Sequence, residues 1–68
     1  MKLSARNQFK GKITEIKKGP VSTEVVLDVN GTIVVSSITT GSAESLGLNV
    51  GDEAIAVIKA SNVMIGKE

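Results

Sequence analysis

The dipeptide Asn30-Gly31 is the feature that most restricts the fold of this 68-residue chain. It stands between two runs rich in Val, Ile and Thr, residues 21–29 and residues 32–39. Asn and Gly both tolerate the positive φ angles of a type I′ turn, which joins two antiparallel strands in a hairpin. The middle of the chain is therefore predicted to form a β-hairpin.

The segments on both sides of this hairpin are also typical of strands. Residues 9–16 alternate between apolar and polar with a change of phase before Ile16, and residues 54–59 and 63–65 are two further apolar runs. Val, Ile and Thr supply 21 of the 68 residues, and their β-branched side chains favour strands over helices. The chain is therefore predicted to be mostly β.

One short helix is predicted between the third and fourth strands, over residues 40–47. Either Thr40 or Ser42 is suited to be its N-cap, because a hydroxyl oxygen can accept a hydrogen bond from the first turn. Glu44 is expected in the first turn, and Gly47 as the left-handed residue that ends the helix. The side chains expected to pack the helix on the sheet are Leu46 and Leu48.

Five strands with one short helix match a small Greek-key barrel of the OB type, and we expect a single domain over residues 1–68. A monomer of this size buries only about 60% of its unfolded surface, and Phe9 is the only aromatic residue. The third and fourth strands are apolar on both faces, so their outer faces are candidates for contacts between subunits. A two-layer monomer with exposed valines is the alternative.

The absence of Cys and His excludes thiol nucleophiles, imidazole bases, disulfides and the usual zinc ligands. The pair Asp52-Glu53 is typical of a turn that enters a strand rather than of an acid/base pair. No apolar run is long enough to span a membrane, and the N-terminus lacks the apolar core of a signal peptide. We expect a cytoplasmic protein that is not an enzyme and has no membrane partner.

Positive charge is concentrated near the N-terminus. Residues 1–18 hold six basic residues against Glu15 alone, a local balance of +5, whereas the remaining residues sum to −4. Most of these lysines are expected to lie on a solvated strand face.

The segment Ser4-Ala5-Arg6-Asn7 differs, because a helical turn capped by Ser4 would direct free N–H groups and the Arg6 guanidinium at one oxyanion. A surface Arg6 with Ser4 as a cap is the alternative. Further donors that could join it are Lys59 and the hydroxyls of Ser36, Ser37, Thr39, Thr40 and Ser42.

Four segments carry a resemblance to a known family. They read K-L-S-A-R-N-Q-F-K-G-K-I, G-P-V-S-T-E-V-V-L, S-I-T-T-G-S-A-E-S-L-G-L and A-V-I-K-A-S-N-V-M-I, and together they span nearly the whole chain. This pattern resembles the molbindin (Mop) family, small molybdate-binding proteins of the Mop/TOBE domain type. The resemblance implies an OB-type barrel that exchanges a strand between subunits and assembles as a homohexamer, a trimer of dimers. It also implies binding of molybdate or tungstate for intracellular storage and homeostasis of molybdenum, without an organic cofactor.

The resemblance further assigns site residues. Ser4, Ala5 and Arg6 would bind one oxyanion at a subunit interface, and the residues completing that site would be Thr39, Ser42, Lys59, Ala60 and Ser61. Relatives often carry Ser directly after the lysine, so the contact here would come from the Ala60 N–H or from Ser61. A second, axial oxyanion site near a three-fold axis would use Val21 and Ser22, at the turn that enters the second strand.

The chemistry of these side chains agrees with such a ligand. Molybdate, tungstate and sulfate are fully deprotonated dianions at pH 7, and the side chains of the assigned interface residues include no carboxylate to accept the proton of hydrogen phosphate. Sulfate must then be rejected by size.

The alternatives to an oxyanion-binding protein are a nucleic-acid-binding OB module and a structural interaction module. The first is disfavoured, and no nucleic-acid partner is expected, because Phe9 is the only stacking residue and the net charge is +1.

Overall fold

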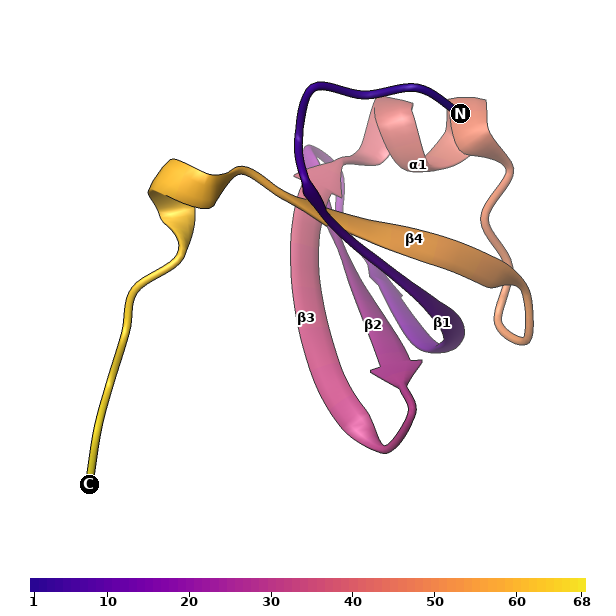
Figure 1. The fold of residues 1–68 in the computed structure, drawn as a ribbon. Helices are drawn as coiled ribbons and strands as arrows, with labels where there is room; N and C mark the ends of the chain where they lie inside the picture. Colours follow the sequence, from indigo (N-terminus) through magenta and orange to yellow (C-terminus); the bar gives the residue numbers. More distant parts are fainter.

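The computed structural model describes all residues 1–68 and contains one antiparallel sheet, one short helix and one 3-10 turn. The sheet has the strand order β3-β2-β1-β4, and Figure 1 shows it strongly curled, with α1 at one end. The prediction of a mostly β chain with one short helix is confirmed. The elements are β1 (Asn7–Lys18), β2 (Ser22–Val29), β3 (Thr32–Thr39), α1 (Thr40–Leu46), β4 (Glu53–Ile58) and η1 (Ala60–Asn62).

Strand β1 bends in its middle and takes part in two ladders. Its first half pairs with β4, from Asn7 opposite Ile58, and its second half pairs with β2, up to Lys18 opposite Thr23. The register with β2 shifts between Ile13 and Glu15, which confirms the predicted change of phase before Ile16. A bulge of this kind increases the local bend, and Figure 1 shows β1 doubling back on itself. This bend curls the sheet around its apolar face.

The predicted hairpin joins β2 to β3. Asn30 and Gly31 have φ angles of 51° and 92°, as a type I′ turn requires, and Val29 pairs with Thr32 on either side of them. The Gly31 N–H donates to Asp28 Oδ1 at 2.7 Å, and this bond ties the turn to the end of β2. The prediction from the Asn-Gly pair is confirmed.

The helix agrees with the prediction at its end and differs at its start. Gly47 ends it in the left-handed conformation, with φ 63°. The N-cap is Thr39 and not Thr40 or Ser42, because the Thr39 hydroxyl accepts from the Ser42 N–H at 3.1 Å. Glu44 therefore lies beyond the first turn, which holds no acidic residue.

The face of α1 that meets the sheet is also different from the predicted one. Thr40 and Ala43, three residues apart, are its buried residues. Leu46 is 68% exposed, so the prediction that it packs on the sheet is wrong, whereas Leu48 packs against the core.

Neither end of the chain forms the element expected of it. Residues 1–6 form no helical turn, because a single turn fixes several dihedral angles for one hydrogen bond. Instead, Gln8 Nε2 donates to the Ala5 carbonyl at 2.7 Å and holds this segment against the start of β1.

The sheet has four strands, and residues 63–65 do not form the predicted fifth. A strand needs a neighbour to satisfy its backbone groups, and this segment runs away from the rest of the chain (Figure 1). Met64 and Ile65 are each 92% exposed.

The core of the single chain is small. Only six of the 68 residues are buried, and the fully apolar cluster consists of Ile13, Val25 and Leu27. Because β3 and β4 do not pair with each other, an apolar groove of about 540 Å³ opens into the curled sheet. The residues lining this apolar groove include Val25, Leu27, Ile38, Leu48, Ala54 and Ala56. The outer faces predicted for subunit contacts are exposed as well, at Ile33, Val35, Ile55 and Val57.

Ile13 is expected to be the most sensitive core position, because its side chain is 1% exposed and lies where β1 bends. Ile13→Ala should lower the free energy of unfolding by about 2–5 kcal/mol, the usual cost of such a truncation. Urea titration followed by circular dichroism measures this change. Val50→Ala, in an exposed turn, is the control and should change stability by less than about 0.5 kcal/mol. Equal effects of the two substitutions would contradict the assigned core.

Candidate functional site

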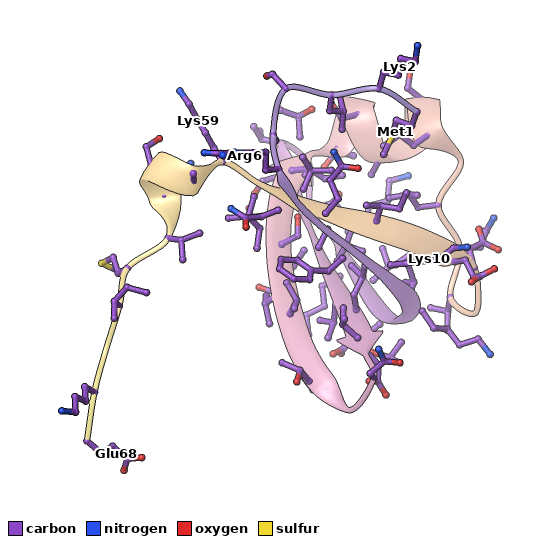
Figure 2. All side chains as sticks on the ribbon, in the orientation of Figure 1. Met1, Lys2, Arg6, Lys10, Lys59 and Glu68 are labelled. Atoms are coloured by element: carbon purple, nitrogen blue, oxygen red, sulfur yellow. The ribbon has the colours of Figure 1, made fainter.

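Two basic side chains from opposite ends of the chain lie at one end of the β1/β4 ladder. Asn7 and Ile58 form the last pair of that ladder, so Arg6 and Lys59 follow on side by side. The Asn7 side-chain amide donates to the Ile58 carbonyl at 3.1 Å and fixes the backbone next to Lys59. Figure 2 shows both basic side chains directed away from the sheet at this end. The register of β1 with β4 thus brings together Arg6 and Lys59, two of the predicted site residues.

Neither Arg6 nor Lys59 has an anionic partner within the chain. The three ion pairs involve other lysines, and both members of each pair are exposed: Lys10 with Glu53 at 3.9 Å, Lys17 with Glu15 at 4.0 Å and Lys18 with Glu44 at 3.7 Å. These three lysines lie on solvated surface, as predicted. Arg6 and Lys59 remain as adjacent cations whose hydrogen-bond donors are free.

Further donors lie next to this pair. The turn η1 begins directly after Lys59, and its Asn62 N–H donates back to the Lys59 carbonyl at 2.8 Å. The N–H groups of Ala60 and Ser61 have no acceptor within the chain, as is usual at the start of a helical turn. The Ser4 hydroxyl, on the other side of Arg6, also makes no hydrogen bond and is exposed. This end of the sheet therefore offers donors and no ionised acceptor.

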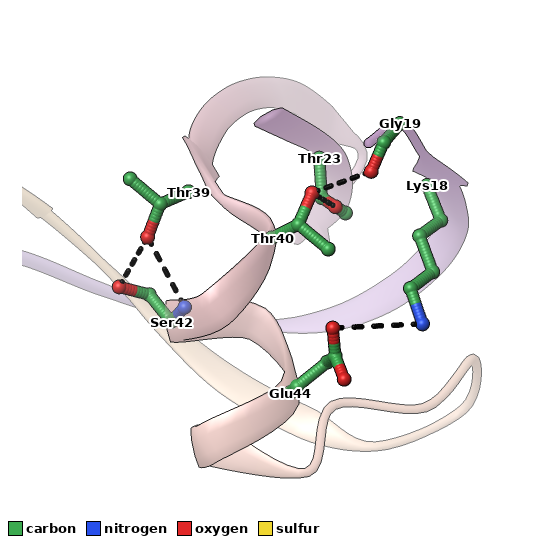
Figure 3. A network of polar contacts seen from close by, with 7 residues as sticks. All are labelled: Lys18, Gly19, Thr23, Thr39, Thr40, Ser42 and Glu44. Atoms are coloured by element: carbon green, nitrogen blue, oxygen red, sulfur yellow. Dashed lines mark hydrogen bonds and ion pairs between the residues drawn. The ribbon is translucent and has the colours of Figure 1, made fainter. Parts of the chain in front are cut away.

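A second group of predicted residues meets at the junction of β3 and α1. Thr39 Oγ1 donates to Ser42 Oγ at 2.7 Å and accepts from the Ser42 N–H at 3.1 Å (Figure 3). The only hydroxyl hydrogen of Thr39 is thus used within the chain. The hydrogen of the Ser42 hydroxyl is not, and it can be donated to a ligand.

The residues predicted for the axial site adjoin this junction. Ser22 pairs with Thr39 across the β2/β3 ladder, so the two side chains are on the same face of the sheet. The Val21 carbonyl accepts from the Thr40 N–H at 2.9 Å. Val21 and Ser22, which were predicted for the axial site, are therefore joined by backbone hydrogen bonds to the segment of Thr39, which was predicted for the interface site.

No hydrogen bond or ion pair links the Arg6 and Lys59 pair to the Thr39 and Ser42 pair within one chain. Sequence analysis missed the supporting role of two residues, Asn7 and Gln8, whose amides order the segments beside Arg6 and Lys59. Both belong to the S-A-R-N-Q motif, which was the available signal. The Thr40 hydroxyl, which the sequence suggested as a further anion donor, is instead used within the chain, where it donates to the Gly19 carbonyl. Its buried contact with the Thr23 hydroxyl was not predicted.

No group of three or more Asp or Glu side chains is arranged to hold a metal cation. None of the helical segments has the length and hydropathy needed to cross a membrane.

Comparison with known proteins places this fold and these motifs among molybdenum proteins. Residues 3–65 match the TOBE domain family. Molybdenum-pterin-binding protein 3 of Clostridium pasteurianum is 52% identical over 66 residues, which cover 96% of this chain and 97% of that protein. A molybdate-binding protein from Sporomusa ovata has a similar structure, with a TM-score of 0.94 at 39% identity over 98% of this chain and 100% of that one. The cytoplasmic molybdate-binding protein ModG, with molybdate bound, gives a TM-score of 0.84 at 44% identity over 88% of this chain and 43% of ModG.

Proposed function

This chain belongs to the TOBE domain family, and within it to the molbindin (Mop) proteins, and from that membership we propose that it binds the molybdate oxyanion. The observation that carries the proposal is the pair Arg6 and Lys59, two adjacent cations without any carboxylate partner. Two positive charges neutralise a dianion, and the planar guanidinium of Arg6 can bind two of its oxygens at once.

The donors around this pair favour a fully deprotonated anion. The Ser4 hydroxyl and the N–H groups of Ala5, Ala60 and Ser61 all lie in the segments that flank Arg6 and Lys59. Hydrogen phosphate carries a proton that would need an acceptor, and an unsatisfied donor costs about 1–3 kcal/mol. Tungstate has the charge and nearly the size of molybdate, so it should bind as well.

We infer that the site is completed by another copy of the chain. Thr39 and Ser42 from a neighbouring subunit would face Arg6 and Lys59, and Val21 and Ser22 would form the second, axial site. The exposed segment of residues 63–65 would supply the fifth strand by pairing with a partner subunit, in a homohexamer built as a trimer of dimers. The apolar groove and the small core support this assembly, because a lone chain leaves so much apolar surface uncovered.

The proposed role is storage and homeostasis of molybdenum in the cytoplasm, by a single domain that binds and releases the anion without catalysis. ModG, a relative of similar structure, is a cytoplasmic molybdate-binding protein, which supports the location. Binding to nucleic acid is not favoured, since Phe9 is the only aromatic side chain on which a base could stack.

Native mass spectrometry with and without molybdate tests subunit number and bound anions in one experiment. We expect a hexamer that gains mass with molybdate or tungstate, and calorimetry should give affinities at least about fivefold weaker for hydrogen phosphate, which leaves a donor unsatisfied. A protein that stays monomeric and takes up neither molybdate nor tungstate would overturn the proposed function. A tight complex with single-stranded DNA or RNA at about 0.1 M salt would support the nucleic-acid alternative instead.

A further inference from the structure

We propose that Thr40 is a positioning residue that holds the two oxyanion sites in register and so determines which size of anion they accept. The proposal rests on the proposed function, because it concerns the same sites. Thr40 itself is 7% exposed and touches no ligand, so it would act only through its neighbours. Its side chain and backbone bind the 19–22 turn, which carries Val21 and Ser22.

Thr40 makes two hydrogen bonds to that turn. Its hydroxyl donates to the Gly19 carbonyl at 2.6 Å (Figure 3), and its N–H donates to the Val21 carbonyl at 2.9 Å. The turn is closed by the Gly19 N–H, which donates to the Ser22 carbonyl at 3.0 Å. The turn and the first residue of α1 are therefore one hydrogen-bonded unit.

The direction of each bond follows from counting hydrogens. The Thr40 hydroxyl has one hydrogen, and Gly19 receives it. At the 2.8 Å contact between the two buried hydroxyls, Thr23 must then be the donor and Thr40 the acceptor. The Thr23 hydroxyl, on a residue that is 1% exposed, thus donates to Thr40, and its side chain makes no hydrogen bond to the 19–22 turn.

This unit lies between the groups assigned to the ligands. Thr39 and Ser42, on either side of Thr40, make the exposed hydroxyl pair of one site. Ser22, opposite Thr39 in the ladder, belongs to the other. A shift of the turn against the helix would move both sets of donors together, and oxyanions that differ mainly in radius are distinguished by the spacing of such donors.

The turn itself has little freedom to adjust. A Cβ at position 19 would lie 2.6 Å from the Ser22 carbonyl oxygen, so the chain passes too closely here for a side chain. With the Thr40 hydroxyl present, the Gly19 carbonyl is fixed as well. Removing that hydroxyl frees the carbonyl while leaving the Thr40 N–H bond to Val21 intact.

Two substitutions of equal size separate positioning from stability. Thr40→Val removes the bond to Gly19, whereas Thr23→Val removes a buried hydroxyl from the same pair and leaves the bond to Gly19 in place. Thr40→Ser keeps the hydroxyl and serves as the conservative rescue. Thr40→Ala is measured in parallel, because it lacks the hydroxyl without adding a methyl group in its place. Each variant is titrated with molybdate and with sulfate by calorimetry on the assembled protein.

Thr40→Val and Thr40→Ala are expected to weaken molybdate binding by about five- to tenfold. They should also lower the ratio of the molybdate affinity to the sulfate affinity. Thr23→Val and Thr40→Ser should keep that ratio within about twofold of the wild type, although Thr23→Val should also lower the melting temperature. An unchanged ratio in both hydroxyl-free variants, or an equal loss of the ratio in Thr23→Val, would overturn the positioning role while leaving the proposed function standing. A wild-type protein that binds no molybdate would overturn both, and the first titration reveals it.

Discussion

Arg6→Ala is expected to weaken molybdate binding by about ten- to a hundredfold, corresponding to about 1.5–3 kcal/mol for hydrogen bonds to a charged group. The guanidinium is exposed, has no ion-pair partner in the chain and lies beside Lys59 at the end of the β1/β4 ladder. Its removal leaves a dianion with one adjacent cation and without a bidentate contact. Calorimetric titration of the assembled protein with molybdate measures the change directly.

The matched control is Lys12→Ala. Lys12 is an exposed cation on β1, the strand that begins directly after Arg6, and it also lacks an ion-pair partner, so both variants lose the same charge. Its register partners are Asp28 and Glu53, far along the ladder from Arg6. We expect Lys12→Ala to bind molybdate within about twofold of the wild type, because a remote exposed charge is largely screened by salt. If both variants bind with wild-type affinity, Arg6 is not part of the site.

Deleting residues 63–68 is expected to dissociate the proposed hexamer and to lower the melting temperature strongly. Within one chain these residues are all exposed, and Met64 and Ile65 contribute nothing to the core. If they form a strand on a partner subunit, each large apolar side chain buried there contributes about 1.5–3 kcal/mol. The loss would then come entirely from contacts between chains. Native mass spectrometry and thermal unfolding at several protein concentrations measure assembly and stability.

Removing only residues 66–68 provides the control, since Gly66, Lys67 and Glu68 carry no apolar side chain that a partner could bury. This shorter deletion should leave both the proposed hexamer and the melting temperature unchanged. Should the longer deletion behave in the same way, residues 63–65 have no role in assembly, and the apolar groove must be covered by something else.

Local sequence was enough for the elements whose geometry depends on a few adjacent residues. The Asn30-Gly31 hairpin, the phase change in β1 and the helix end at Gly47 were predicted because each requires a backbone conformation that those residues favour. The start of α1 could not be predicted in this way. Thr39, Thr40 and Ser42 are all good caps, and Thr39 takes the role because the Thr40 hydroxyl is bound to Gly19, far away in sequence.

The residues of the candidate site could also be named from the sequence, whereas their arrangement could not. Arg6 and Lys59 could be named as donors from their chemistry and from the resemblance to molbindins, but their adjacency depends on the register of β1 with β4. The contact between Ser22 and the Thr39 segment depends on the register of β2 with β3. Register is set by the bulge and by the burial of one face of the sheet, which are properties of the whole sheet and not of any segment.

The sequence by itself therefore predicted the class of fold from its β-branched residues and its one tight turn, and it predicted the kind of ligand from the resemblance to molbindins, with which its cations and hydroxyls agree. Only the tertiary structure decided that Arg6 and Lys59 lie next to each other, that the Thr40 hydroxyl ties the turn to the helix, and that residues 63–65 find no neighbour in their own chain. The physical reason is that side-chain chemistry and turn geometry are local, whereas strand pairing and burial depend on which distant segments come together.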